Sequence, residues 1–202
     1  MAGAVDISDF PHGRVPRELR RRQLVELAEE LFAERGYAGA SMDELARRAG
    51  VTKPVVYEAF GSKDGLFRAC VERAFARMAD SVASTVRAET DPEARLRAGG
   101  LAFLRFAHDN RVAWDLMAMD GGGRFAEQAV SVRRNQAQLI RELMEEVASD
   151  DVDRRELEAA AYVVNSAYEG AALWMWEHPE MPVEQVAEWI VDLLIPGLRR
   201  FT

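Results

Sequence analysis

Cysteine is almost absent from this sequence, since Cys70 is the single one in 202 residues. One thiol cannot form a disulfide within the chain, which argues against a disulfide-stabilised secreted domain and favours a reducing compartment. Apolar stretches of transmembrane length are also missing, and the first residues lack the basic start and apolar run of a secretory signal. We therefore expect a cytoplasmic protein with no membrane partner.

Features that carry catalysis or bind metals are equally scarce. His12, His108 and His178 do not have the spacing of metal ligands. There is no Ser-His-Asp order or nucleophile elbow, and the glycine run at 121–123 lacks the Lys-Ser/Thr pair of a phosphate-binding loop. We expect no metal, no cofactor and no enzymatic activity. A helical enzyme, one rival interpretation, would need a polar catalytic cluster that this sequence does not offer.

The charge is distributed unevenly along the chain. The net charge is −8, but residues 1–77 carry +1 and residues 78–202 carry −9. A basic run, Arg20-Arg21-Arg22, lies in the first part. This asymmetry is typical of a DNA-facing module attached to an acidic body, although chance scatter of charge gives the same counts.

Apolar residues recur at helical spacing nearly throughout, and no convincing strand pattern occurs, so we predict an all-α fold. Residues 1–15 have no period and are expected to form a loose arm. Gly99-Gly100 weakens one of the predicted helices, because a glycine inside a helix costs about 1 kcal/mol. The predicted helices are 17–35, 42–49, a short one after Thr52, one from Ser62, 92–109, 111–119, 124–148, 153–177 and 183–195, the last stopped by Pro196-Gly197.

Two short helices with a glycine between them predict a helix-turn-helix over about residues 41–60. Ser41 and Glu44 match a capping box, in which each side chain accepts from the backbone amide of the other residue. Thr52 is expected to cap the second helix, whose outer face is then free to enter a major groove. The residues expected to face the core of the motif are Leu45, Ala46, Ala49, Val51, Val56 and Phe60.

The stretch LVELAEELFAERGYAGASMDELARRAGVTKPVVYEAFGSKDGLF, within residues 17–75, closely resembles the N-terminal domain of the TetR family of regulators. The matching parts are an amphipathic helix ending in a Gly-aromatic pair, a capped second helix, a Gly-Val-Thr-Lys turn, and Ser-Lys-Asp before the fourth helix. The resemblance implies a three-helix DNA-binding domain over residues 16–77 and a larger ligand-binding and dimerisation domain over residues 78–202.

The resemblance also implies which residues contact DNA. Lys53, Pro54 and Val55 would occupy the base-reading start of the recognition helix, and Val55 would pack on a thymine methyl group. Two positions depart from the family pattern, since Glu58 stands where an aromatic residue is frequent and Ala59 where a histidine is frequent. Both departures affect local phosphate contacts rather than docking. The implied phosphate contacts and supporting positions are Ser41, Thr52, Tyr57 and Lys63.

All four tryptophans lie in the C-terminal part of the chain. An aromatic set at helical spacing is typical of an ordinary core, whereas the resemblance implies a cavity for a small, largely apolar effector. Asn165 and Glu169 are the candidate polar anchors, and Glu169 would suit a cationic group. The other candidate lining residues are Phe103, Phe106, Trp114, Met117, Tyr162, Tyr168 and Trp174.

The last two predicted helices combine a small-residue patch with a wide apolar stripe. These surfaces can pack on one another within the chain, or they can form a four-helix bundle with a second copy, and the resemblance favours the homodimer. The candidate interface residues are Ala167, Gly170, Ala171, Val186, Trp189, Ile190, Leu193 and Leu194.

These features together predict a homodimeric, sequence-specific regulator that binds a pseudo-palindromic operator in double-stranded DNA. Repression relieved by a small molecule is the commonest mode in the family that the sequence resembles. An architectural protein that binds DNA without sequence choice is the alternative, and it predicts no preference for a palindrome.

Overall fold

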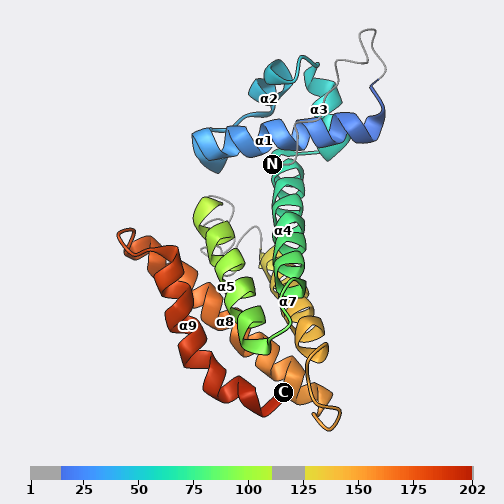
Figure 1. Ribbon diagram of the computed structural model, residues 1–202. Coiled ribbons are helices and arrows are strands. Elements are labelled where there is room, and N and C mark those ends of the chain that lie inside the picture. The colour runs from blue at the N-terminus through green and yellow to red at the C-terminus, as the bar shows by residue number, and fades with distance from the viewer. Residues whose placement is uncertain (1–14, 111–125, 202) are drawn as a thin grey trace. The chain divides into compact units, whose positions relative to one another are not determined.

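The computed structural model describes residues 15–110 and 126–201, and every regular element in these residues is a helix (Figure 1). The chain divides into two compact units, Met1–Ala74 and Phe75–Thr202. The boundary falls inside α4 (Lys63–Arg87), three residues before the domain boundary expected from the sequence. The helix predicted over 111–119 lies outside the described residues. No helix within the described ranges has the length and apolar character needed to cross a membrane.

The N-terminal unit contains α1 (Arg17–Gly39), α2 (Met42–Arg48), α3 (Lys53–Phe60) and the start of α4. The regular part of α1 ends where the sequence predicts, because Gly36 has non-helical angles (φ 66°, ψ 172°) and only a short turn follows it. One face of α1 is buried at helical spacing, through Leu24, Val25, Ala28, Leu31 and Phe32. This stripe is the surface that α1 contributes to the core of the unit.

The start of α2 confirms half of the predicted capping box. The Ser41 hydroxyl accepts a hydrogen bond from the backbone amide of Glu44 at 3.2 Å. The carboxylate of Glu44 instead accepts from the guanidinium groups of Arg47 and Arg48. A charge-assisted bond to arginine is stronger than one to a neutral amide, which explains why the reciprocal half of the box gives way.

The turn between α2 and α3 follows the predicted helix-turn-helix. Gly50 has φ 63°, a left-handed conformation that residues with a Cβ adopt only at a cost, so the turn stays short. Thr52 is the N-cap of α3, but its side chain makes no capping hydrogen bond, contrary to the expectation. Val56 is fully buried, whereas Phe60 is only half-buried and has the Arg21 guanidinium 5.1 Å from its ring centroid.

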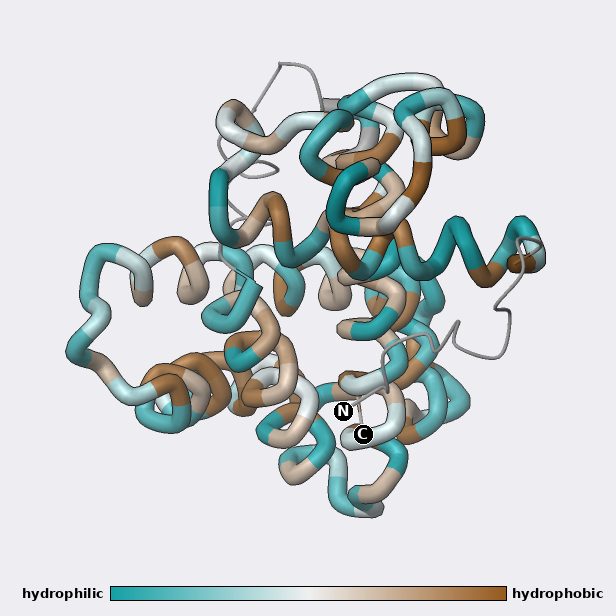
Figure 2. The backbone as a smooth tube through the Cα atoms, turned by 90° about the horizontal axis from the view of Figure 1, so that it is seen from above, coloured by the Kyte–Doolittle hydropathy of each residue, from teal (hydrophilic) through white to brown (hydrophobic). Residues whose placement is uncertain are grey.

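The C-terminal unit contains α5 (Pro92–Asp109), α7 (Ala126–Glu145), α8 (Arg154–Glu177) and α9 (Val183–Leu198), with the second half of α4. Contacts join α8 to both α7 and α9, and α5 to both α8 and α9. Hydropathy alternates between apolar and polar along these helices, as expected when one face is buried (Figure 2). A 3₁₀ turn, Arg199–Phe201, ends the unit, and the Phe201 carbonyl accepts from the Ser149 amide at 2.9 Å.

Two predicted helix-breaking sites, Pro196-Gly197 and Gly99-Gly100, lie inside continuous helices. The prediction that Pro196-Gly197 stops the last helix is wrong, because α9 continues through Pro196 to Leu198. A proline in a final turn removes a single backbone hydrogen bond close to the end, where carbonyls already lack partners. The Gly99-Gly100 pair lies inside an unbroken α5, and a Cβ at Gly100 would lie 2.0 Å from the Tyr168 hydroxyl oxygen. Packing against Tyr168 therefore accounts for a glycine that helix propensity disfavours.

Candidate nucleic-acid interface and ligand cavity

The outward side of α3 is open to solvent. Val56 is its one buried residue, while Lys53, Pro54, Val55 and Tyr57 are exposed. Val55 is 36% exposed and Tyr57 is 41% exposed, unusually high for apolar and aromatic side chains in a folded domain. A helix of this kind can enter a major groove without losing its own packing.

Lys53, at the N-terminus of α3, is oriented by two neighbours. Its ammonium nitrogen lies 2.8 Å from Oδ1 of Asp43 and 5.7 Å from the centroid of the Tyr57 ring. The hydrogen bond and charge of Asp43 raise the pKa of Lys53, so the side chain remains cationic. The carboxylate beside this lysine was not anticipated from the sequence, although Asp43 lies in the first turn of a predicted helix that precedes the recognition helix.

Lys63 begins α4 and is held by the end of α1. Its ammonium group donates to the Ala38 carbonyl at 3.2 Å and lies 4.6 Å from the centroid of the Tyr37 ring. The Tyr37 hydroxyl in turn donates to the carboxylate of Asp64. Ser62 caps the helix, because its hydroxyl accepts from the Gly65 amide at 3.0 Å. These contacts fix the start of α4 against α1, and Lys63 retains donors for a phosphate.

Ion pairs tie the surface helices of the N-terminal unit together. Arg48 of α2 binds Glu34 of α1, with its Nη2 2.6 Å from Oε2, and it also binds Glu44. The hydrogen bond from Arg48 lowers the pKa of Glu34. In α4, Arg73 binds both Glu26 and Glu29 of α1. The helices that position α3 are thus cross-linked by polar contacts as well as by their core.

A cavity of about 150 Å³ lies in the C-terminal unit. Its walls are almost entirely apolar and come from the second half of α4 and from α5, α7, α8 and α9. Phe103, Asn165 and Tyr168, three of the candidate lining residues, are in these walls. The apolar side chains from α4 and α7 that line it are Met78, Val82, Val86, Leu139, Ile140, Leu143 and Met144.

Three polar side chains in the cavity wall are buried: Gln136, Asn165 and Tyr168. The Asn165 amide donates to Glu169 at 3.0 Å, and the Tyr168 hydroxyl donates to the Leu96 carbonyl at 3.4 Å. Burial raises the pKa of Tyr168, which keeps its hydroxyl neutral. The Gln136 amide oxygen has no hydrogen-bond partner among the described residues.

The remaining candidate lining residues lie elsewhere. Glu169 is outside the wall and pairs with Arg133 at 2.9 Å, so it already has a cationic partner. Phe106 is half-buried and packs 5.8 Å from the Phe75 ring centroid. Tyr162 and Trp174 are exposed on α8, because the helical period turns them away from the core. Trp114 and Met117 lie outside the described residues.

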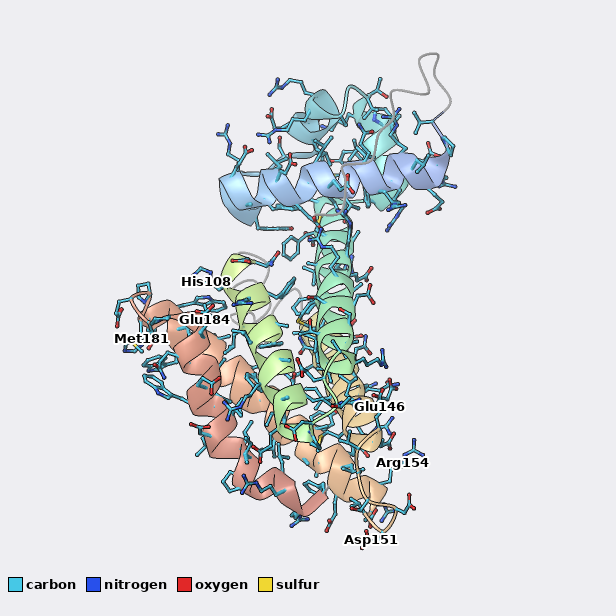
Figure 3. All side chains as sticks on the ribbon, in the orientation of Figure 1. His108, Glu146, Asp151, Arg154, Met181 and Glu184 are labelled. Carbon is cyan, nitrogen blue, oxygen red and sulfur yellow. The ribbon has the colours of Figure 1, made fainter. Side chains whose placement is uncertain are left out.

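The charged residues of the cavity wall are paired with one another or with close neighbours. Arg95 donates to Glu146 at 2.9 Å and to the Glu89 carbonyl at 3.0 Å. Arg199 lies 2.7 Å from the carboxylate of Glu93. Glu146 marks this end of the unit in Figure 3, together with Asp151 and Arg154, whereas His108 and Glu184 lie at the opposite end.

A second surface of the C-terminal unit is apolar and exposed. The α8 and α9 helices contact each other, and the Trp174 and Trp189 rings lie 6.3 Å apart between centroids. Trp189 is 49% exposed and Leu193 is 73% exposed. The other large apolar side chains exposed on α8 are Tyr162, Val163 and Leu173. Several exposed apolar side chains on neighbouring helices are typical of protein interfaces.

The structure separates a buried group from an exposed group among the candidate interface residues. Ala171 and Val186 are buried within the chain, because they face the neighbouring helices, and they cannot lie at a surface. Gly170, Trp189 and Leu193 are exposed. Ala167, Ile190 and Leu194 are half-buried between the two groups. The apolar stripe predicted as an interface on α9 was too wide, because Val186 at one edge of it is buried in the core of the unit.

Sequence reasoning missed the cavity wall formed by α4 and α7. The spacing of Ala129, Gln136, Ile140 and Leu143 places a glutamine in the apolar stripe of α7, and this interruption was the available signal. The candidate lining residues expected from the sequence were mostly aromatic instead. The walls that aliphatic and methionine side chains form resemble an ordinary core in sequence, so they gave no separate signal.

Comparison with family models matches both units. Residues 24–70 match the model described as bacterial regulatory proteins, tetR family. Residues 92–197, more than half of the chain, match the model described as tetracyclin repressor-like, C-terminal domain. The first range lies within the N-terminal unit, and the second lies within the C-terminal unit.

Individual relatives match about half of the chain or more. The chain is 46% identical over 99 residues to the HTH-type transcriptional activator FasR of Mycolicibacterium smegmatis, a match that covers 48% of this chain and 45% of that protein. It is 27% identical over 158 residues to the regulator BetI of Rhizobium meliloti, covering 74% and 76%. The crystal structure of a TetR-like transcriptional regulator from Rhodococcus sp. RHA1 is 29% identical, with a TM-score of 0.65 over 92% of this chain and 99% of that one. The match to FasR thus spans less than half of the length of that protein.

Proposed function

Because the chain belongs to the TetR family of bacterial regulatory proteins, we propose that it is a homodimeric repressor released from its operator by a small, largely apolar ligand. The observation that carries the DNA-binding function is the outward side of α3, where Lys53, Val55 and Tyr57 are exposed while Val56 anchors the helix. Family members are transcription regulators rather than enzymes. A DNA-binding regulator acts in the compartment that holds the DNA, which supports the cytoplasmic location expected from the sequence.

The DNA contacts divide into two kinds. Lys53, Pro54 and Val55 read base edges, because they stand at the exposed N-terminal turn of α3. Tyr57 and Lys63, with Ser41 and Thr52, contact the phosphate backbone and fix the register. The cationic Lys53 and Lys63 side chains support this division, since each keeps hydrogen-bond donors for an anionic or acceptor partner.

The exposed surface of α8 and α9 forms the homodimer interface. Trp189 and Leu193 would lose their solvent contact against a second copy, and the exposed Gly170 allows the backbones to approach closely. Two helices from each chain make a four-helix bundle. A two-fold dimer then requires a pseudo-palindromic operator with half-sites about one helical turn apart, roughly 34–36 Å, or a multiple of that distance.

The α4 helix provides the connection between ligand and DNA. It begins with Lys63 and later contributes Met78, Val82 and Val86 to the cavity wall. A ligand that pushes these side chains tilts α4 and changes the separation of the two recognition helices in the dimer. Operator affinity falls only if the ligand prefers the geometry that does not bind DNA, and couplings of about 1–3 kcal/mol, roughly 5- to 150-fold, are typical.

Selection of operator fragments from random duplexes tests the DNA-binding function directly. We expect one enriched two-fold sequence and a footprint with two-fold symmetry. Equal affinity for all duplexes would identify an architectural protein instead. A promoter fusion carrying that operator tests the direction of control: expression should rise when the gene is deleted, whereas a fall would make the protein an activator, as FasR is named.

Trp189→Glu tests the interface. A buried carboxylate at the centre of the two-fold contact should abolish the dimer and reduce operator affinity by about 100-fold or more, since each half-site alone binds weakly. Val130→Glu is the matched control, because Val130 is a similarly exposed apolar residue on α7. Sedimentation equilibrium measures the oligomer and fluorescence anisotropy the DNA affinity. A wild-type monomer at micromolar concentration would refute the dimer.

A further inference from the structure

We infer that the cavity takes a ligand whose enclosed part is uncharged and largely apolar and carries one hydrogen-bond donor, which the side-chain oxygen of Gln136 accepts. This inference rests on the proposed function, because it names the class of ligand for the cavity through which operator binding is controlled. Three observations carry it: an unpartnered amide oxygen, the paired state of the other polar groups in the wall, and the volume of the cavity.

The side-chain amide oxygen of Gln136 is a strong hydrogen-bond acceptor in the wall, and no described residue donates to it. Gln136 lies on α7 and is 6% exposed, and its Oε1 atom is buried with no hydrogen-bond partner in the part of the chain that the structure describes. Its Nε2 atom donates to the sulfur of Met78 at 3.8 Å, and a thioether is a weak acceptor. A buried carbonyl without a donor destabilises the folded chain. A ligand hydroxyl or N–H group in the cavity would remove that cost.

The other two buried polar side chains of the wall, Asn165 and Tyr168, each donate a hydrogen bond. Asn165 donates to Glu169, which is itself paired with Arg133. The Tyr168 hydroxyl donates to the Leu96 carbonyl, and burial raises its pKa, so it offers no anion to a cationic ligand. Among the described lining residues, the ligand therefore gains its strongest polar contact at Gln136.

A charged group inside the cavity would lack a counter-ion. The wall contains Arg95, Arg199 and Glu93, but Arg95 pairs with Glu146, and Arg199 pairs with Glu93. A ligand carboxylate or ammonium group would have to break one of these pairs or be buried alone, and both are costly. Glu169, the anchor expected for a cationic ligand, is already paired with Arg133 and lies outside the wall.

The volume sets the size of the probe. A cavity of about 150 Å³ accommodates a molecule as large as benzene. Phenol and toluene have nearly the same shape and differ in whether they carry a hydrogen-bond donor. Benzoate has a similar ring and adds a negative charge. These three compounds therefore separate the three parts of the inference.

The experiment measures binding of each probe to the full chain through the ¹³C-methyl NMR signals of Met78 and Met144, which both line the cavity. The quantity of interest is the ratio of phenol to toluene affinity, because it cancels differences in general hydrophobicity. In Gln136→Leu this ratio should fall about tenfold, the effect of one lost hydrogen bond to a buried group. Gln138→Leu, at an exposed position on the same helix, is the matched control and should leave the ratio unchanged.

A stability measurement shows whether a change in the ratio comes from a destabilised fold rather than from the lost hydrogen bond. Gln136→Leu removes an unsatisfied buried oxygen, so the unliganded variant should melt at the same temperature as wild type or higher, whereas a residue that held the fold together would lower it. Gln136→Met provides a second apolar replacement of similar length and should reproduce the altered ratio.

Three results would overturn the inference. They are a phenol-to-toluene ratio that Gln136→Leu leaves within twofold of wild type, methyl shifts caused by benzoate at the concentrations at which phenol acts, and no methyl shift with phenol at millimolar concentration. Operator affinity is measured in parallel with the same probes. An altered ratio without any change in operator affinity would contradict control of DNA binding by the cavity while leaving the ligand class standing. An unaltered ratio with operator release would contradict the ligand class alone.

Discussion

In the N-terminal unit the centre is filled, since Leu24, Leu45 and Val56 are completely buried, whereas in the C-terminal unit the central side chains surround a cavity. The groups that we propose to contact DNA stand outside the first core. The groups that we propose to receive a ligand stand inside the second, together with a buried amide oxygen that has no hydrogen-bond partner among the described residues. The difference follows from the two tasks, because a docking helix needs a fixed platform, whereas a binding unit needs space that a ligand can occupy.

This comparison predicts that the two cores respond differently to loss of a leucine side chain. Leu45→Ala should lower the free energy of unfolding of its unit by about 2–5 kcal/mol and abolish DNA binding, because α2 then no longer supports α3. Leu139→Ala, at the half-buried wall of the cavity, should cost about 1 kcal/mol. Urea unfolding distinguishes the units, since all four tryptophans are in the C-terminal one.

For Leu45→Ala, circular dichroism should show the early loss of helix while tryptophan fluorescence keeps the wild-type midpoint. Equal losses of stability for the two leucines would contradict the contrast between a filled core and an open one.

The next largest effect concerns a close contact within the C-terminal unit. Gly100→Ala places a methyl group 2.0 Å from the Tyr168 hydroxyl oxygen, so Tyr168 must move. Overpacking of this kind costs about 1–3 kcal/mol and should shrink or reshape the cavity. Gly39→Ala, whose nearest neighbour would be 3.4 Å away at the end of α1, should change stability by less than about 0.5 kcal/mol. Thermal unfolding of both variants measures the difference, and a neutral Gly100→Ala would show that α5 and α8 yield easily.

The sequence predicted the N-terminal unit more completely than the C-terminal one. Local signals specify the helix-turn-helix: Ser41 caps α2, Gly50 turns the chain at φ 63°, and Val56 faces the core. Each of these signals acts within a few residues, so it can be read without knowing the tertiary structure. The second half of the Ser41 box failed because Arg47 and Arg48 compete for the Glu44 carboxylate, and the Thr52 side chain makes no capping hydrogen bond.

An apolar cavity in the C-terminal unit could be predicted, but most of the residues that form its wall could not. Its wall depends on which faces of five helices meet, and periodicity gives one apolar face per helix without naming its neighbour. Phe103, Asn165 and Tyr168 were anticipated, whereas Tyr162 and Trp174 were assigned to the wrong side of α8. The interface residues Ala171 and Val186 were misplaced for the same reason, because a wide apolar stripe serves both an internal contact and an external one.

Lys63→Ala should separate phosphate contact from base reading in the N-terminal unit. Loss of one cation should weaken binding to all duplexes alike, by about tenfold, and should reduce the slope of log affinity against log salt by about one. Lys63→Arg keeps the charge and should preserve the slope. Anisotropy titrations at several salt concentrations provide the measurement. A change in preferred sequence with an unchanged slope would assign Lys63 to base reading instead.

Asp43→Asn should produce the smallest effect and one of opposite sign. In the free protein the Asp43 carboxylate lies 2.8 Å from the Lys53 ammonium group, and both side chains are exposed. An exposed pair of this kind contributes about 0.2–1 kcal/mol, and the carboxylate also repels the DNA phosphates. Its removal should therefore tighten operator binding about threefold and steepen the salt dependence, while stability changes little. Glu158→Gln, which removes the same charge from an exposed position in the C-terminal unit, should leave operator affinity unchanged if the effect is local. Weaker binding by Asp43→Asn would mean that Asp43 holds Lys53 in its base-reading orientation, and the pair would then belong to the recognition surface of α3 rather than compete with it.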